Sequence, residues 1–147
     1  MSGFTSIPDA KQIAIQHLLE GTINRSHLPK SGKKFPVGAT VQLEADDTVD
    51  GITTGEKLYG TVIVQEQKSG KVTVKTNLAA IIGAVAKGAG VTRGALLKEI
   101  PADTITNEKL TVSVAASTNY ATHIALTTGA DGAEVMVGLL LAPIVKS

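Results

Sequence analysis

Two stretches of the chain carry nearly the same pattern of residues, and this internal repeat restricts the fold more than any other feature. Gly38-Ala39 is followed nine residues later by Asp47-Thr48-Val49, and Gly94-Ala95 is followed at the same distance by Asp103-Thr104-Ile105. The matching segments are 38–49 with 94–105, 59–64 with 120–125, and 72–74 with 135–137. Both copies supply strands and turns, and neither supplies an obvious set of reactive groups. The repeat therefore predicts a scaffold.

Short segments in which apolar and polar residues alternate predict half-buried antiparallel strands, since successive side chains of a strand face opposite sides. Glycine, aspartate and serine separate these segments. The expected strands are 40–44, 58–65, 71–75, 95–99, 110–115, 122–126 and 134–141. The apolar run 78–86 between the copies is a buried strand or a short helix, and periodicity does not decide between them. An all-β body is favoured.

We therefore predict a mainly β fold, with a compact β-barrel or β-sandwich-like body at 37–147. Two pseudo-repeated β-units, at about 37–76 and 91–145, would build this body. An N-terminal arm, 1–36, precedes it and carries five basic and two acidic residues. The remainder of the chain carries nine basic and eleven acidic residues.

One short helix is expected in the arm, from Asp9 to Glu20. Asp9 can cap it, Gln12 follows three residues later, and Gly21 can end it. The apolar stripe of this helix would be formed by Ala10, Ile13, Ala14, His17 and Leu18, with Ile15 and Leu19 beside it. Such a short helix is marginal alone in water, so we expect it to pack on another surface. Residues 22–36 are expected to form an extended basic tether.

Composition excludes several kinds of chemistry. The chain has no cysteine, which rules out a disulfide framework, a thiolate metal site and a cysteine nucleophile. Its formal net charge is +1 and only 3% of its residues are aromatic, so nucleic acid is not an expected partner. The longest apolar run is about half the length of a membrane span, and no membrane partner is expected.

Few residues qualify as catalytic or metal-binding candidates. His17 and Glu20 lie three residues apart on the expected helix, but they form at best a pair. The acidic residues Asp46, Asp47 and Asp50 lack the spacing of a calcium-binding loop, and a solvated turn is the preferred interpretation. His123 takes the position of Val62 in the other copy, which predicts a strand residue with one side partly in water.

A glycine-rich segment, 88–94, comes close to a dinucleotide-binding motif. That motif needs a helix after it, whereas the segment that follows is strand-like and contains Pro101. A flexible link between the copies is the preferred interpretation. We expect no cofactor, no metal and no catalytic residue. An enzyme built on His123 or on the aspartate cluster is the weaker alternative.

Several of these segments resemble the capsid decoration (cement) proteins of tailed bacteriophages. The first copy contributes Gly38 to Leu43 and the strand-turn-strand from Ile63 to Val74. The second contributes Gly94-Ala95-Leu96-Leu97, which is similar to their "G-A-x-L" strand, and the segments 124–126 and 132–140. The likeness covers roughly residues 37–142, and its motifs are patterns of small and β-branched residues.

The resemblance implies a non-catalytic virion protein, made in the bacterial host cytoplasm, that lies on the outer capsid surface. It would bridge neighbouring major capsid proteins and stabilise the head, commonly as a homotrimer. Within the arm, we expect the following residues to contact the capsid: Arg25, Lys30, Lys33, Lys34 and Phe35. The alternatives are another virion β-module, such as a tail component or head-fibre base, and a glycan-binding surface module.

Overall fold

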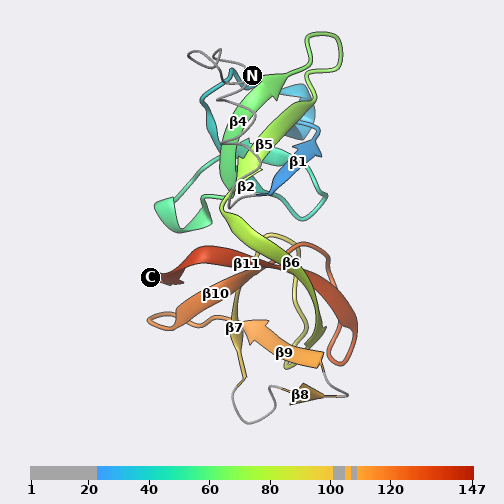
Figure 1. The fold of residues 1–147 in the computed structure, drawn as a ribbon, viewed down its shortest axis with the longest axis vertical. Helices are drawn as coiled ribbons and strands as arrows, with labels where there is room; N and C mark the ends of the chain where they lie inside the picture. The colour runs from blue at the N-terminus through green and yellow to red at the C-terminus, as the bar shows by residue number, and fades with distance from the viewer. Residues whose placement is uncertain (1–22, 101–104, 107–108) are drawn as a thin grey trace, which may run out of the picture.

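The structure, a computed structural model, describes residues 23–100, 105–106 and 109–147. Two β-sheets lie one above the other along the long axis of the molecule, and the strand β6 (Leu78–Ala86) leads from the first sheet into the second (Figure 1). The only helices among the described residues are two 3-10 turns, η1 (Lys30–Gly32) and η2 (Gly55–Lys57). The prediction of a mainly β fold is confirmed. The helix expected at 9–20 lies outside the described residues.

The first sheet contains five strands in the order β1-β5-β4-β2-β3, and all neighbouring strands are antiparallel. Its strands are β1 (Asn24–His27), β2 (Thr40–Leu43), β3 (Val49–Gly51), β4 (Gly60–Gln65) and β5 (Val72–Thr76). Alternation explains which face is buried. In β5, Val72 and Val74 are fully buried while Thr73 and Lys75 are half-buried, as a period of two requires.

The second sheet is a closed barrel. Its strands after β6 are β7 (Leu96–Glu99), β8 (Ile105–Thr106), β9 (Lys109–Val114), β10 (Tyr120–Ala125) and β11 (Glu134–Val145). The order is β6-β11-β10-β7-β9-β8, and β6 also pairs with β9 in parallel, so that five strands close on themselves and β8 stays outside the ring. Closure leaves no unpaired edge in these five strands. The segment 78–86 is thus a strand, the first of the two alternatives that its apolar run allowed.

Both sheets connect their strands in the same way. Without β8, each sheet places its first strand beside its fifth, then its fourth, second and third. The parallel pairing of β6 with β9 has a counterpart in the first sheet, where Pro29, just after β1, forms a parallel bridge with Val49 of β3. The N–H of Val49 donates to the carbonyl oxygen of Leu28 at 3.0 Å. This bridge draws the two ends of the first sheet together.

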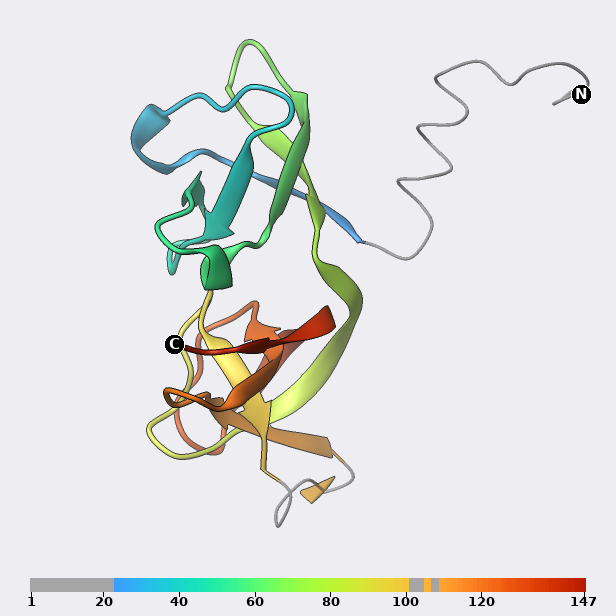
Figure 2. The same cartoon turned by 90° about the vertical axis from the view of Figure 1, so that its left-hand side faces the viewer.

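The wall of the barrel buries side chains on both faces. Leu97 and Ala125 point into the barrel, where they join one apolar cluster. Their neighbours Leu96 and Ile124 point outward and belong to a second cluster, which includes Val41 and Tyr59 of the first sheet region. A continuous apolar core therefore links the outside of the barrel to the first sheet. Figure 2 shows the first sheet above the barrel from the side.

The first sheet begins earlier in the chain than the sequence suggested. Residues 24–27, which we expected to lie in an extended tether, form β1 and pair with Val72–Lys75 of β5. The segment Asn24-Arg25-Ser26-His27 has no apolar residue, so hydrophobic periodicity carries no strand signal there. Backbone pairing with β5 and burial of His27 hold it in place. Phe35, further along the same segment, packs against the core.

Candidate functional site

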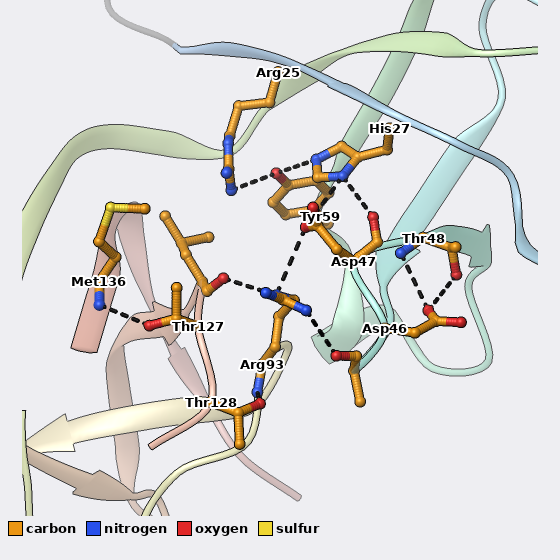
Figure 3. Close-up of polar contacts among 12 residues, drawn as sticks. Arg25, His27, Asp46, Asp47, Thr48, Tyr59, Arg93, Thr127, Thr128 and Met136 are labelled. Carbon is orange, nitrogen blue, oxygen red and sulfur yellow. Dashed lines mark hydrogen bonds and ion pairs between the residues drawn. The ribbon is translucent and has the colours of Figure 1, made fainter. Parts of the chain in front are cut away.

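The most connected polar groups lie where the first sheet meets the barrel, and we call them the inter-sheet cluster. Its members are Arg25, His27, Asp47, Tyr59 and Arg93 (Figure 3). The first two side chains come from β1, and Asp47 comes from the turn between β2 and β3. Tyr59 immediately precedes β4, and Arg93 lies between β6 and β7. Four separate segments thus converge on one place.

A directed chain of hydrogen bonds runs through the buried part of this cluster. His27 and Tyr59 are 3% and 1% exposed, and the Tyr59 hydroxyl lies 2.8 Å from His27 Nε2. His27 Nδ1 lies 2.9 Å from the carbonyl oxygen of Asp47, which can only accept, so Nδ1 carries the proton. In the neutral ring Nε2 then accepts from the Tyr59 hydroxyl. Arg25 Nη1 donates to that hydroxyl at 3.3 Å.

Burial sets the protonation of both rings. It lowers the pKa of His27, against the opposing effect of the Asp47 carbonyl and carboxylate. Burial also raises the pKa of Tyr59 to about 12, although the Arg25 cation beside it acts in the opposite direction. Both side chains are neutral near pH 7, which is the state that the hydrogen-bond chain requires. The rings meet edge to face, with centroids 5.3 Å apart.

Arg93 joins the barrel to the first sheet. Its Nε donates to the carbonyl oxygen of Leu126 at 2.9 Å, and its Nη1 donates to the carbonyl oxygen of Ala45 at 2.8 Å. Its backbone N–H donates to Thr128 Oγ1 at 3.0 Å, and Nε lies 3.6 Å from Asp47 Oδ1. Because its planar guanidinium presents several donors at fixed angles, one side chain can hold carbonyls of both sheets.

A polar cleft of about 310 Å³ lies beside Arg93, between the two sheets. Its charged lining residues are Glu44, Glu56, Lys57, Arg93 and Lys146. The two cluster residues with catalytic potential, His27 and Tyr59, are not among those that line it. Both ring nitrogens of His27 already have partners within the protein. This arrangement serves to fasten the sheets together.

Replacing Tyr59 by phenylalanine is expected to destabilise the protein by about 1–3 kcal/mol, because His27 Nε2 then stays buried without its hydrogen bond. The measurement is the free energy of unfolding from urea denaturation. Tyr120→Phe is the matched control, since Tyr120 occupies the corresponding place in the repeat but is exposed. Equal effects of the two substitutions would contradict the role given to the Tyr59 hydroxyl.

The residues expected to contact a capsid occupy different surroundings. Arg25 belongs to the inter-sheet cluster, and Phe35 packs against the core. Lys30 Nζ donates to Glu44 Oε1 at 2.7 Å, and Lys33 Nζ donates to Asp50 Oδ1 at 2.7 Å. Lys34 is exposed and lines a shallow hollow with Gln65 and Gln67. The structure therefore does not gather these five residues on one surface, and their contact with a capsid stays a prediction.

His123 is more buried than the sequence suggested. We expected one of its sides to be partly in water, but it is 2% exposed and lies in β10 opposite Leu97 and Leu139. Leu97 points into the barrel, and the paired His123 shares that face. Its Nδ1 lies 2.8 Å from Thr122 Oγ1. Burial lowers the pKa of His123, and the nearby Glu99 acts in the opposite direction.

Asp46 and Asp50, between β2 and the end of β3, form hydrogen bonds with different partners. Asp46 Oδ1 accepts from the N–H and the hydroxyl of Thr48, as in an Asx turn, and these hydrogen bonds lower the pKa of Asp46. Asp50 faces Lys33, and that hydrogen bond lowers the pKa of Asp50. In the part of the chain that the structure describes, no group of three or more potential metal ligands comes together. His17 and Glu20 lie outside that part.

The glycine-rich segment 88–94 also differs from a dinucleotide site. Gly88, Gly90 and Gly94 all have positive φ, and the segment leads into the strand β7. The inter-sheet cluster itself was not predicted. Its members are far apart in the sequence, and the repeat gave no indication because Tyr59 and Tyr120 align although only Tyr59 is buried.

No helix within residues 23–100, 105–106 and 109–147 has the length and apolar character needed to cross a membrane. Comparison of the sequence with models of known protein families finds no match, and a search among curated proteins finds none either.

Proposed function

We propose that the chain is a structural protein of a tailed-bacteriophage virion that binds the outer capsid surface and cements neighbouring major capsid proteins. The observation that carries this proposal is an exposed apolar pair on the barrel. Tyr120 and Val145 lie directly opposite each other in β10 and β11, and they are 66% and 53% exposed. Exposed apolar side chains that adjoin each other offer apolar surface that a protein partner can cover.

Two further features support the proposal. The resemblance to capsid decoration proteins covers most of the two-sheet body. The identical strand order in the two sheets also fits a body built from two repeated β-units, as the sequence predicted. Such a body, held by a continuous core, presents two rigid surfaces at a fixed distance. Rigid contacts at several capsid subunits reinforce one another, because each contact after the first is effectively intramolecular.

The binding surface would combine the apolar pair on the barrel with the exposed Lys34, which lies between η1 and β2. Lys34 has no hydrogen bond or ion pair with another described residue, unlike Lys30 and Lys33. It is therefore the basic residue of the predicted set that is available to a partner. A homotrimer on the capsid surface remains part of this proposal.

The test is cryo-electron microscopy of particles of the phage that encodes the chain, together with binding of the purified protein to heads that lack it. We expect two-sheet density on the outer head surface. Tyr120→Glu and Lys34→Glu should each weaken binding to heads by about tenfold, which corresponds to ~1.4 kcal/mol. Lys57→Glu, an exposed residue of η2, is the control and should bind normally.

Density in the tail or at a fibre base would instead support the alternative virion module. Binding to glycans and not to heads would support the glycan-binding alternative. Undiminished head binding by both Tyr120→Glu and Lys34→Glu would refute the surface proposed here, even if the protein does lie on the head.

A further inference from the structure

An apolar groove lies at the junction of the two sheets, and its lining ends at Ile144, next to Val145 of the exposed pair. It has a volume of about 310 Å³ and is formed by Gly55, Leu58, Asn77 and the five residues from Leu140 to Ile144 of β11. None of the described residues that line it is charged, and Leu141 within it is 52% exposed. The groove therefore fits an apolar occupant.

Among the described residues of the lining, the polar side chain is that of Asn77, and it is already used within the protein. Asn77 Nδ2 donates to the carbonyl oxygen of Leu58 at 3.4 Å, and the Asn77 carbonyl accepts from the N–H of Leu141 at 2.9 Å. The second bond ties β11 to the residue just before β6, and the first ties that residue to the segment that precedes β4. The view in Figure 1 shows β11 crossing beside β6 at this level and ending near the C-terminus.

The described chain begins next to this groove. The carbonyl oxygen of Ile23 accepts from the N–H of Thr76 at 3.0 Å and from the Thr76 hydroxyl. Thr76 immediately precedes Asn77, which lines the groove. Consecutive Cα atoms are about 3.8 Å apart, so Ile23, the first described residue, lies close to the groove.

We propose that the apolar groove is the docking site for residues 9–20 of the same chain. Their sequence carries the apolar stripe formed by Ala10, Ile13, Ala14, His17 and Leu18. An amphipathic helix that lays its apolar face into a groove is a common way to bind such a segment. Twelve helical residues span about 18 Å, and the five-residue β11 stretch spans about 16 Å, so the two lengths match.

The same chain is the favoured source of this segment because only residues 21 and 22 separate it from Ile23. A short tether of this kind gives an effective concentration in the millimolar range, well above that of a second copy in dilute solution. The proposal is independent of capsid binding, since it concerns contacts within one molecule.

Hydrogen–deuterium exchange of the full-length chain tests the proposal. Ile13→Asp and Leu18→Asp place a charge on the apolar stripe, and Gln16→Asp is the matched control because Gln16 lies outside the stripe. We expect exchange of the β11 amides at 141, 142 and 144 to become faster by about tenfold or more in the stripe variants. Gln16→Asp should exchange like the original protein. Amides of β10 report on global folding and should be unchanged in all three variants.

Two results would overturn the proposal. The first is unchanged β11 exchange in both stripe variants while β10 remains protected. The second is protection of β11 that is lost on dilution of the original protein, because docking within one chain does not depend on concentration. That second result would assign the groove to a second copy.

Discussion

Gly94→Ala is expected to destabilise the protein by about 2–5 kcal/mol. Gly94 adopts φ +88°, a conformation that costs a residue with a Cβ about 1–2 kcal/mol. A Cβ at this position would also overlap the carbonyl oxygen of Leu43, a backbone atom of β2 that cannot rotate away. Overpacking of this kind typically adds about 1–3 kcal/mol. The clash lies between the barrel and the first sheet, so it strains the contact that unites them.

Gly38→Ala is the matched control for this prediction. Gly38 takes the place of Gly94 in the repeat and has φ +97°, but a Cβ there would have no heavy atom within 4 Å. The Gly38→Ala variant should therefore lose only the free energy of unfolding that the positive φ costs, about 1–2 kcal/mol. Urea denaturation of both variants measures the difference. Equal losses of unfolding free energy in the two variants would show that the backbone at Leu43 can shift at little cost. The contact between the two sheets would then be looser than described.

The same two glycines show why much of the fold was predictable. Each lies in a turn just before a strand, β2 or β7, and glycine is the residue that allows the required positive φ. The alternation of valines in β5 predicted that strand for an equally local reason. Signals of this kind depend on neighbours along the chain, and the sequence contains them directly.

Features that depend on distant partners were not predictable. Sequence alignment of the copies pairs Val49 with Ile105, yet β9, and not β8, takes the place beside β7 that β3 holds beside β2. The second copy has extra residues between Ile105 and Tyr120, and these supply the additional strand. The ion pairs of Lys30 and Lys33 span 14 and 17 residues, so no local pattern identifies them. Because the sequence does not reveal these ion pairs, both lysines were expected to contact a partner.

His27 illustrates the same limit within the candidate site. Its segment has no hydrophobic pattern, and its partners Tyr59 and Asp47 lie 32 and 20 residues away. Burial of this histidine follows from the pairing of β1 with β5 and from the isolated bridge between Pro29 and Val49. Its chemistry is therefore a property of the assembled fold.

Mild acid is expected to destabilise the protein steeply because two buried histidines must stay neutral. Burial lowers the pKa of His27 and of His123 below the usual 6.5 in the folded state. Below pH 6.5 the unfolded chain takes up protons at these positions while the folded chain does not, so the free energy of unfolding falls as the pH falls. Each histidine contributes up to ~1.4 kcal/mol per pH unit to the slope of the unfolding free energy against pH. The two together contribute up to ~2.7 kcal/mol per pH unit.

The carboxylates act in a lower pH range and can be separated from this effect. The pKa values of Glu44 and Asp50 are lowered by Lys30 and Lys33, so the stability they add is present above their usual values of 4.5 and 3.8 and is lost only on further acidification. Urea denaturation between pH 7 and pH 5 therefore isolates the histidines. His27→Gln and His123→Gln should each lose about half of the slope, whatever their effect on stability at pH 7. A free energy of unfolding that does not change across this range would mean that both rings take up protons in the folded protein as readily as in the unfolded chain, which would contradict the lowered pKa values of His27 and His123.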